Sequence, residues 1–287
     1  MPKKIRKYLP VTITLSILAL GAIIFGGYLL WNTLRPEESH GNTGYAAGDM
    51  RERLAQANEN IPATTVDNNK LSHDENGYII YTENGVKTSR TGIDVSKWNG
   101  EIDWKKVRAA GVEFAMIRIG SRTVTGGNIV LDPCFHDNIK GALDAGIKVG
   151  VYFYTQAVTK EEAEEEALFC LENMAGYDVT YPVVFDTERY EGNARANDLD
   201  STLRTEIAKA FMDKIKNSGF TPAIYMNTSW SIMSVDLESL SDYDLWYAYY
   251  GDDLYYPYRF TIWQYTDKGE IPGIKGHVDL NISFAEY

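Results

Sequence analysis

From residue 91 onward, short β-prone runs alternate with stretches of helical periodicity, and this alternation constrains the fold more than any other feature. The β-prone runs lie at 92–98, 114–120, 148–156, 182–188, 222–230, 245–250, 260–266 and 277–283. Helical stretches at 103–110, 135–145, 160–175 and 202–218 are each followed by a glycine, the residue that most often ends a helix. Alternating strands and helices predict a parallel sheet, and eight strands in one α/β domain predict a closed barrel.

The second half of this pattern is depleted in helices. After the fifth β-prone run, the gaps at 231–244, 251–259 and 267–276 are too short for full-length outer helices. We therefore expect an incomplete (β/α) barrel of eight strands over 91–287, with reduced helices after strand five.

The N-terminal region has the character of a membrane anchor. Residues 9–31 carry no charge and are long enough to cross a bilayer, which takes about 20 helical residues. Basic side chains precede the run and favour the cytoplasmic side: Lys3, Lys4, Arg6 and Lys7. A cleaved signal peptide is the alternative, but the run exceeds a usual h-region and no A-x-A site closes it. We expect 1–34 to be a cytoplasmic tip and transmembrane signal-anchor. The protein is then held in the cell membrane, with the rest of the chain on the extracytoplasmic side.

Residues 35–90 differ in composition from the regions on either side. They are rich in Asn, Glu, Thr, Gly and Ser and poor in apolar residues, which predicts a weakly folded stalk. Within it, residues 77–86 include the Asn84-Gly85 pair after a β-prone run, which favours a small hairpin.

Charge, cysteine and histidine content exclude several functions. The chain carries 28 Lys and Arg against 40 Asp and Glu, and an acidic surface argues against nucleic acid and suits a sugar-based substrate or simple solubility. The four histidines show no metal-binding spacing, so we expect neither metal nor cofactor. Cys134 and Cys170 are expected to be free thiols, because they fall at different heights on two parallel helices.

Acidic side chains mark the candidate active site. In such barrels the site lies at the C-terminal ends of the strands, where this chain places Asp94, Asp186, Glu188 and Asp279. If 182–188 is one strand, Asp186 and Glu188 share a face about 6.6 Å apart. Clustered acids favour one protonated member, as a general acid requires. The competing interpretation is that Asp186 caps a loop and Glu188 is merely exposed.

Aromatic and amide side chains supply the candidate substrate-binding residues. Aromatic rings stack on sugars, although any one of them more commonly fills a core. Amides can hydrogen-bond sugar hydroxyl or acetamido groups. The candidates are Tyr152, Tyr154, Tyr225, Asn227, Trp246, Trp263 and Gln264.

At these motifs the chain resembles the glycoside hydrolase family 25 muramidases. The resemblance covers 91–287 and rests on GIDVSKWNGEIDW, AMIRIG, GVYFYTQA, PVVFDTE, AIYMNTSW and WQYTDKGEIPGIKGHVDLN in order. It implies hydrolysis of the β-1,4 bond from N-acetylmuramic acid to N-acetylglucosamine in peptidoglycan, with Glu188 as acid/base and Asp186, Asp94 and Asp279 as the other site carboxylates. Residues 153–156 depart from members that carry a His-Phe pair and a following Arg.

Alternative functions and mechanisms remain open at this point. A chitinase-like enzyme would show a longer D-x-x-D-x-D-x-E run, and a silent wall-binding module would not need every site carboxylate. For the muramidase, the D-x-E arrangement favours Asp186 orienting the substrate's own 2-acetamido group, which gives retention. Activation of a water by Asp94 or Asp279 would give inversion.

Overall fold

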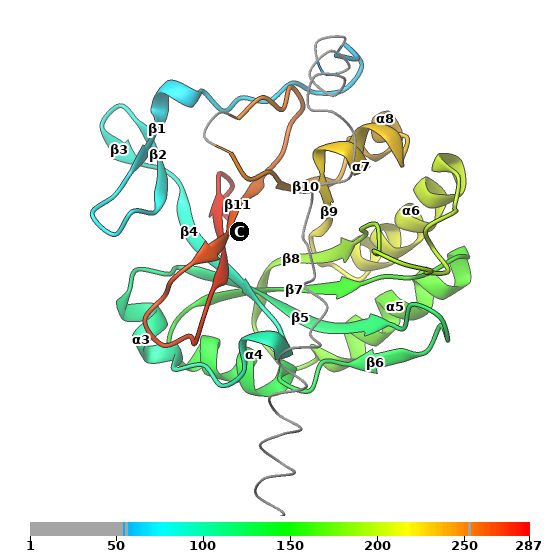
Figure 1. Cartoon of the computed structure of the whole chain (residues 1–287), viewed down its shortest axis with the longest axis horizontal. Helices are drawn as coiled ribbons and strands as arrows, with labels where there is room; N and C mark the ends of the chain where they lie inside the picture. Colours follow the sequence, from blue (N-terminus) through cyan, green and yellow to red (C-terminus); the bar gives the residue numbers. More distant parts are fainter. Residues whose placement is uncertain (1–53, 55–56, 252–253) are drawn as a thin grey trace, which may run out of the picture. The chain divides into compact units, whose positions relative to one another are not determined.

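The computed structural model describes residue 54, residues 57–251 and residues 254–287, and its main sheet is a closed barrel. The strand order is β4 (Arg90–Val95), β12 (Val278–Ser283), β11 (Ile262–Gly269), β10 (Asp244–Ala248), β9 (Pro222–Asn227), β8 (Val179–Asp186), β7 (Lys148–Tyr154), β5 (Phe114–Arg122) and β6 (Ile129–Leu131). An additional pairing of β4 with β5 closes eight of these strands into a barrel (Figure 1). The ninth strand, β6, pairs antiparallel with the end of β5 and is not part of the closed barrel. The predicted eight-stranded barrel is confirmed.

One strand runs against the other seven. The pairings from β4 through β5, β7, β8, β9 and β10 to β11 are parallel. β12 is antiparallel to both of its neighbours, β11 and β4, so the expectation of a fully parallel sheet is wrong for this strand. The start of β12 therefore lies at the barrel end where the parallel strands finish.

The outer helices follow the predicted pattern. They are α3 (Trp104–Ala109), α4 (Phe135–Asp144), α5 (Lys160–Asn173) and α6 (Ser201–Asn217). Each is followed by a glycine with positive φ, which a residue with a side chain rarely adopts: Gly111, Gly146, Gly176 and Gly219. After β9 the described part of the chain adds only two short helices, α7 (Thr228–Met233) and α8 (Leu237–Leu240). The barrel is thus incomplete on its β10 to β12 side.

Apolar side chains fill the interior of the barrel at the end opposite the mouth, so the polar groups that could act on a substrate lie at the mouth. Phe114 and Tyr181 stack with ring centroids 4.5 Å apart. Gly92 makes room for them, because a Cβ there would lie 2.3 Å from the Phe114 ring. A separate and larger apolar cluster lies between the strands and the outer helices.

Residues 57–90 are packed against the barrel, contrary to the expectation of a weakly folded stalk. They contain η1 (Asn68–Lys70), β1 (Leu71–His73), β2 (Ile79–Glu83) and β3 (Val86–Lys87). The predicted hairpin is confirmed, with Asn84 and Gly85 both at positive φ. Tyr78 and Tyr81 are buried in the outer apolar cluster, so a few aromatic residues provide the burial that the overall composition does not suggest.

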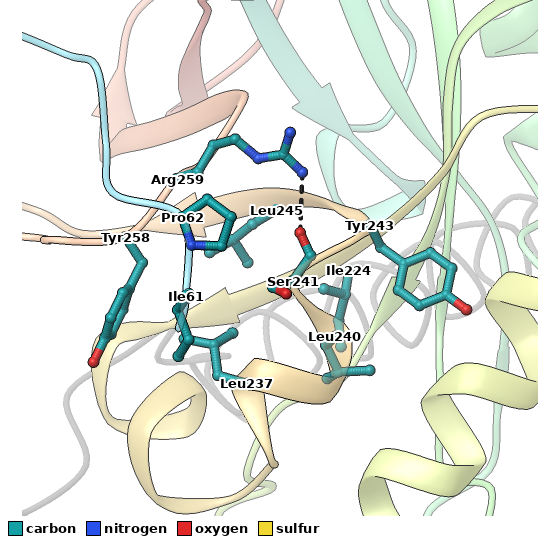
Figure 2. A pocket seen from close by; sticks show the side chains of 10 residues that line it. All are labelled: Ile61, Pro62, Ile224, Leu237, Leu240, Ser241, Tyr243, Leu245, Tyr258 and Arg259. Carbon is teal, nitrogen blue, oxygen red and sulfur yellow. Dashed lines mark hydrogen bonds between the residues drawn. The ribbon is translucent and has the colours of Figure 1, made fainter. Parts of the chain in front are cut away.

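The start of this segment covers the barrel where helices are missing. Ala63 forms an antiparallel bridge with Tyr258, and Thr64 N–H donates to the Pro257 carbonyl over 2.8 Å. Ile61 and Pro62 close a small pocket whose other wall includes Leu245 of β10 (Figure 2).

Two further expectations concern the cysteines and the anchor. Cys134 and Cys170 are both free thiols, as predicted. The predicted span at 9–31 lies outside the described residues. Among the residues that are described, none belongs to a helix with the length and apolar character needed to cross a membrane.

Candidate active site

Four carboxylates approach one another at the mouth of the barrel. Asp94 on β4 and Asp279 on β12 are direct register partners. Asp186 is the last residue of β8, and Glu188 follows two residues later. Asp94 and Asp186 are buried, with 6% and 4% of their surface exposed, whereas Glu188 and Asp279 are half-buried. The structure therefore brings together all four residues that the sequence identified.

Two tyrosines report on this charge cluster. Burial raises the pKa of the Tyr225 hydroxyl well above its ordinary value, and charges including those of Glu188, Asp186 and Asp94 raise it further. Burial also raises the pKa of Tyr250, with contributions from Asp279, Asp94 and Glu188. Each of the four carboxylates is thus close enough to act on at least one of these two hydroxyl groups.

The position of Glu188 differs from the expectation in one respect. β8 ends at Asp186, so Glu188 belongs to the following loop rather than to the strand. Strand alternation and its 6.6 Å spacing therefore do not fix the direction of Glu188 relative to Asp186. The loop fixes that direction instead.

A hydrogen-bonded network holds Asp94. Its Oδ2 accepts from Gln264 Nε2 over 2.8 Å and from Asn281 Nδ2 over 2.7 Å. The Gln264 carbonyl accepts in turn from Tyr225 and Tyr250 hydroxyls, over 2.8 and 2.7 Å. Because two amides donate to Oδ2, this oxygen is an acceptor and not the site of an acid proton.

The network includes two residues that the sequence reasoning missed. Asn281 carried a usable signal, since it lies two residues after Asp279 on the same strand and hence on the same face. Tyr250 follows β10 in a loop, and nothing distinguishes it in sequence from the other tyrosines of the chain.

Two aromatic candidates form the floor of the site. Trp246 is 2% exposed and Tyr225 is 4% exposed, and their rings meet edge to face with centroids 4.8 Å apart. The indole N–H of Trp246 donates to Asn281 Oδ1 over 2.8 Å. Such buried rings support the Asp94 network and leave little surface for a sugar. Tyr152 and Tyr154 are half-buried, and Tyr154 is the register partner of Asp186.

Two other substrate-binding candidates are placed elsewhere or used differently. Trp263 faces outward, because strand alternation sends it to the opposite side from its neighbour Gln264. Its indole N–H donates to the Tyr249 carbonyl and its ring is buried in the outer apolar cluster, so the structure places Trp263 outside the barrel and not at the mouth where it was predicted. Asn227 caps helix α7, where its Oδ1 accepts from Trp230 N–H.

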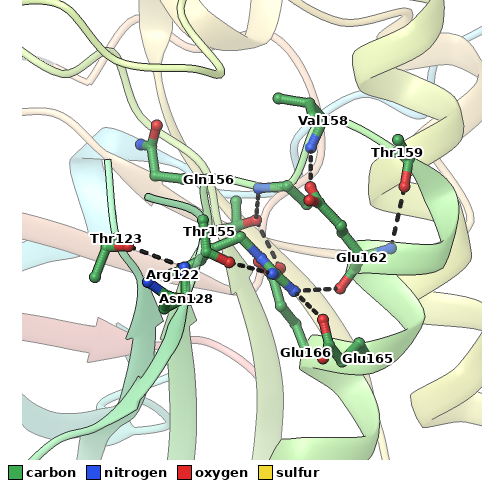
Figure 3. Close-up of polar contacts among 12 residues, drawn as sticks. Arg122, Thr123, Asn128, Thr155, Gln156, Val158, Thr159, Glu162, Glu165 and Glu166 are labelled. Carbon is green, nitrogen blue, oxygen red and sulfur yellow. Dashed lines mark hydrogen bonds and ion pairs between the residues drawn. The ribbon is translucent and has the colours of Figure 1, made fainter. Parts of the chain in front are cut away.

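Ion pairs and hydrogen bonds, some of them fully buried, support the segments that follow β5 and β7 (Figure 3). Glu166 is fully buried and accepts from Arg122 Nε and Thr155 Oγ1, each over 2.7 Å. Burial raises the pKa of Glu166 to about 7, against the opposite effects of Thr155 and Arg122. Glu162 binds Arg195 through both oxygens, over 2.8 and 2.9 Å, and so ties the β8–α6 loop to α5.

In the described part of the chain, no group of His, Cys, Asp or Glu side chains is arranged to hold a metal ion. The chemistry that this mouth supports is proton transfer and charge stabilisation by carboxylates, next to tyrosine and amide groups that suit a hydroxyl-rich ligand.

Comparison with known proteins agrees with this geometry. The sequence model of glycosyl hydrolases family 25 matches residues 93–274. Lysozyme M1 of Streptomyces globisporus is 31% identical over 209 residues, which cover 66% of this chain and 66% of that protein.

Solved structures share the fold. The modular autolysin LytC of Streptococcus pneumoniae matches with a TM-score of 0.61 and 26% identity, over 74% of this chain and 51% of LytC. The chain thus spans about half of LytC, which has also been solved with a synthetic peptidoglycan ligand. The bacterial lysozyme of Streptomyces coelicolor matches with a TM-score of 0.55 and 27% identity, over 67% of this chain and 90% of that one.

Proposed function

The chain belongs to glycosyl hydrolases family 25, and from this premise we propose that it is a muramidase that cleaves the β-1,4 bond from N-acetylmuramic acid to N-acetylglucosamine in peptidoglycan. The observation that carries the proposal is the meeting of Asp94, Asp186, Glu188 and Asp279 at one barrel mouth in a member of this family. The names of its relatives, lysozyme and autolysin, support the same substrate.

Glu188 is the proton donor in this proposal. It is half-buried at the mouth, whereas Asp94 uses Oδ2 to accept from two amides. A general acid must reach the leaving glycosidic oxygen, and a side chain on the loop just beyond the strand has that reach. Replacing Glu188 by Gln keeps the shape and removes the transferable proton. We expect Glu188→Gln to release no soluble fragments from purified peptidoglycan, and full activity in this variant would overturn the role.

Asp186 serves the second catalytic function by orienting the 2-acetamido group of the substrate, which acts as the nucleophile and gives retention. Its burial at the end of β8, next to the loop that carries Glu188, supports this role. Glycan lacking the N-acetyl group on the muramic residue should then resist cleavage. Unimpaired cleavage of such strands, or an inverted anomeric product at early times, would instead assign water activation to Asp94 or Asp279.

The proposal extends to location. Residues 9–31 anchor the chain in the cell membrane with the barrel on the cell-wall side, supported by the uncharged run and the basic residues before it. Protease added to intact protoplasts should remove the barrel. Recovery of a soluble form lacking the first 31 or so residues as the main species would contradict the anchor.

A further inference from the structure

The loop that carries Glu188 has no regular structure of its own. Residues 187–200, between β8 and α6, contain neither helix nor strand, although Asp186 and Glu188 lie at or beside its start. A proton donor must be held within a fraction of an ångström of its working position. Within the loop, the Asn197 side chain hydrogen-bonds Tyr190 and Gly192, and a contact from outside the loop reaches the residue just before Glu188.

Trp230 of α7 makes that contact. Its indole N–H donates to Thr187 Oγ1 over 3.2 Å, and Thr187 is the residue between the two carboxylates. Both partners are buried, with 6% of Trp230 and 3% of Thr187 exposed. An indole N–H can only donate, so the direction of this bond is unambiguous.

Trp230 is itself held at its backbone and at its ring. Its backbone N–H donates to the capping side chain of Asn227 over 2.9 Å, which fixes the start of α7. The Arg204 guanidinium lies 4.4 Å from the Trp230 ring centroid. Arg204 is 4% exposed and donates to the carbonyls of Ala196 and Leu199, over 2.9 and 3.2 Å. Trp230 thus binds Thr187 at the start of the loop, and Arg204 binds Ala196 and Leu199 near its end.

We propose that Trp230 is a positioning residue for Glu188, acting through its hydrogen bond to Thr187, and that Arg204 holds the indole in place while closing the far end of the loop. The inference rests on the proposed role of Glu188. It gives a physical reason for the AIYMNTSW motif, in which Asn227 caps the helix and Trp230 reaches the catalytic segment.

The test compares two variants that break the same bond from opposite sides. Thr187→Val keeps the side-chain shape but removes the acceptor, and Trp230→Phe keeps an aromatic ring but removes the donor. On soluble, uncross-linked glycan strands, each should lower kcat about 3- to 10-fold and leave KM within about 2-fold, as expected for one hydrogen bond of ordinary strength. The double variant should lose no more than either single variant, because both remove one interaction.

Controls separate positioning from folding. Thr187→Ser keeps the acceptor and should recover most of the wild-type kcat. Trp104→Phe makes the same change in α3, where Trp104 packs against Gly141 in the apolar cluster outside the barrel, and should lower the melting temperature while sparing kcat. A wild-type kcat in Thr187→Val, or equal kcat losses in Trp230→Phe and Trp104→Phe, would overturn the positioning role. Failure of the proposed function has a different signature, since the wild-type protein would then release no fragments.

Discussion

Asp279 at the start of β12 lies directly opposite Asp94 near the end of β4, in an antiparallel pair. Side chains at directly opposed positions share one face of the sheet, with Cβ atoms about 5 Å apart. Two acids held this close repel each other, and the fold maintains the pair at the mouth of the site.

Replacing Asp279 by Asn should change stability and activity in opposite directions. The change removes one of two opposed negative charges, so the melting temperature should rise, by the equivalent of about 0.5 to 1 kcal/mol. Fragment release from peptidoglycan should fall in the same variant. Thermal unfolding and a turnover assay on one preparation measure both effects, and a lower melting temperature would contradict the repulsion argument.

Replacing Gln264 by Leu should be strongly destabilising. Leu removes the acceptor for the Tyr225 and Tyr250 hydroxyls and one of the donors to Asp94. Buried polar groups that lose a partner cost about 1 to 3 kcal/mol each, so we expect a total loss of about 3 kcal/mol or more. Denaturant unfolding measures this. The matched variant Gln264→Glu keeps the acceptor oxygens and should lose less stability at acidic pH than at neutral pH.

The barrel was predictable because the same local pattern recurs along the chain. Each early β-prone run is followed by a helical stretch and a glycine, and the glycines adopt the positive φ that ends the helices. The direction of β12 was not predicted, because the alternation of residues within a strand does not indicate whether it pairs parallel or antiparallel. The connection from Gly269 to Val278 did hold a usable clue, since a parallel crossover needs about a dozen residues or more.

The site was predictable as a set of carboxylates but not as a network. Asp94, Asp186 and Asp279 follow from their places on strands. The direction of Glu188 is set by a loop, which the sequence pattern does not describe. The partners of Asp94 lie on strands distant in sequence, so they depend on which strands pair and not on the local pattern. Trp263 and Gln264 should not both have been predicted at the mouth, because neighbouring residues on one strand point to opposite faces, and only the structure shows that Gln264 is the inner one.

The cover formed by residues 57–66 should contribute to barrel stability. A chain that begins at residue 67 loses the bridge at Ala63 and exposes the apolar surface under Ile61 and Pro62. It should melt at a lower temperature than a chain that begins at residue 57, because buried apolar area and backbone hydrogen bonds are lost together. Equal melting temperatures for the two chains would show that the cover is not part of the cooperative unit.

Glu166 should make stability depend on pH in a specific direction. Its pKa is raised from 4.5 to about 7 in the folded state, so the folded chain binds more protons than the unfolded chain between these values. The contribution of this group therefore favours folding below pH 4.5 and weakens as pH rises to 7, by at most about 3 kcal/mol.

Comparison with Glu166→Gln isolates this contribution, because Gln does not titrate. The stability of the wild type minus that of Glu166→Gln should decrease from pH 4.5 to 7 and level off above it. A difference that increases over the same range would mean that Arg122 stabilises the ionised carboxylate by more than burial disfavours it.

The identity of the new reducing end tests the central claim most directly. Purified peptidoglycan digested with the wild-type protein, reduced with borohydride and analysed by mass spectrometry should yield fragments that end in reduced N-acetylmuramic acid. Fragments ending in reduced N-acetylglucosamine, or no release of fragments by the wild-type protein, would contradict the assignment of this chain as a muramidase.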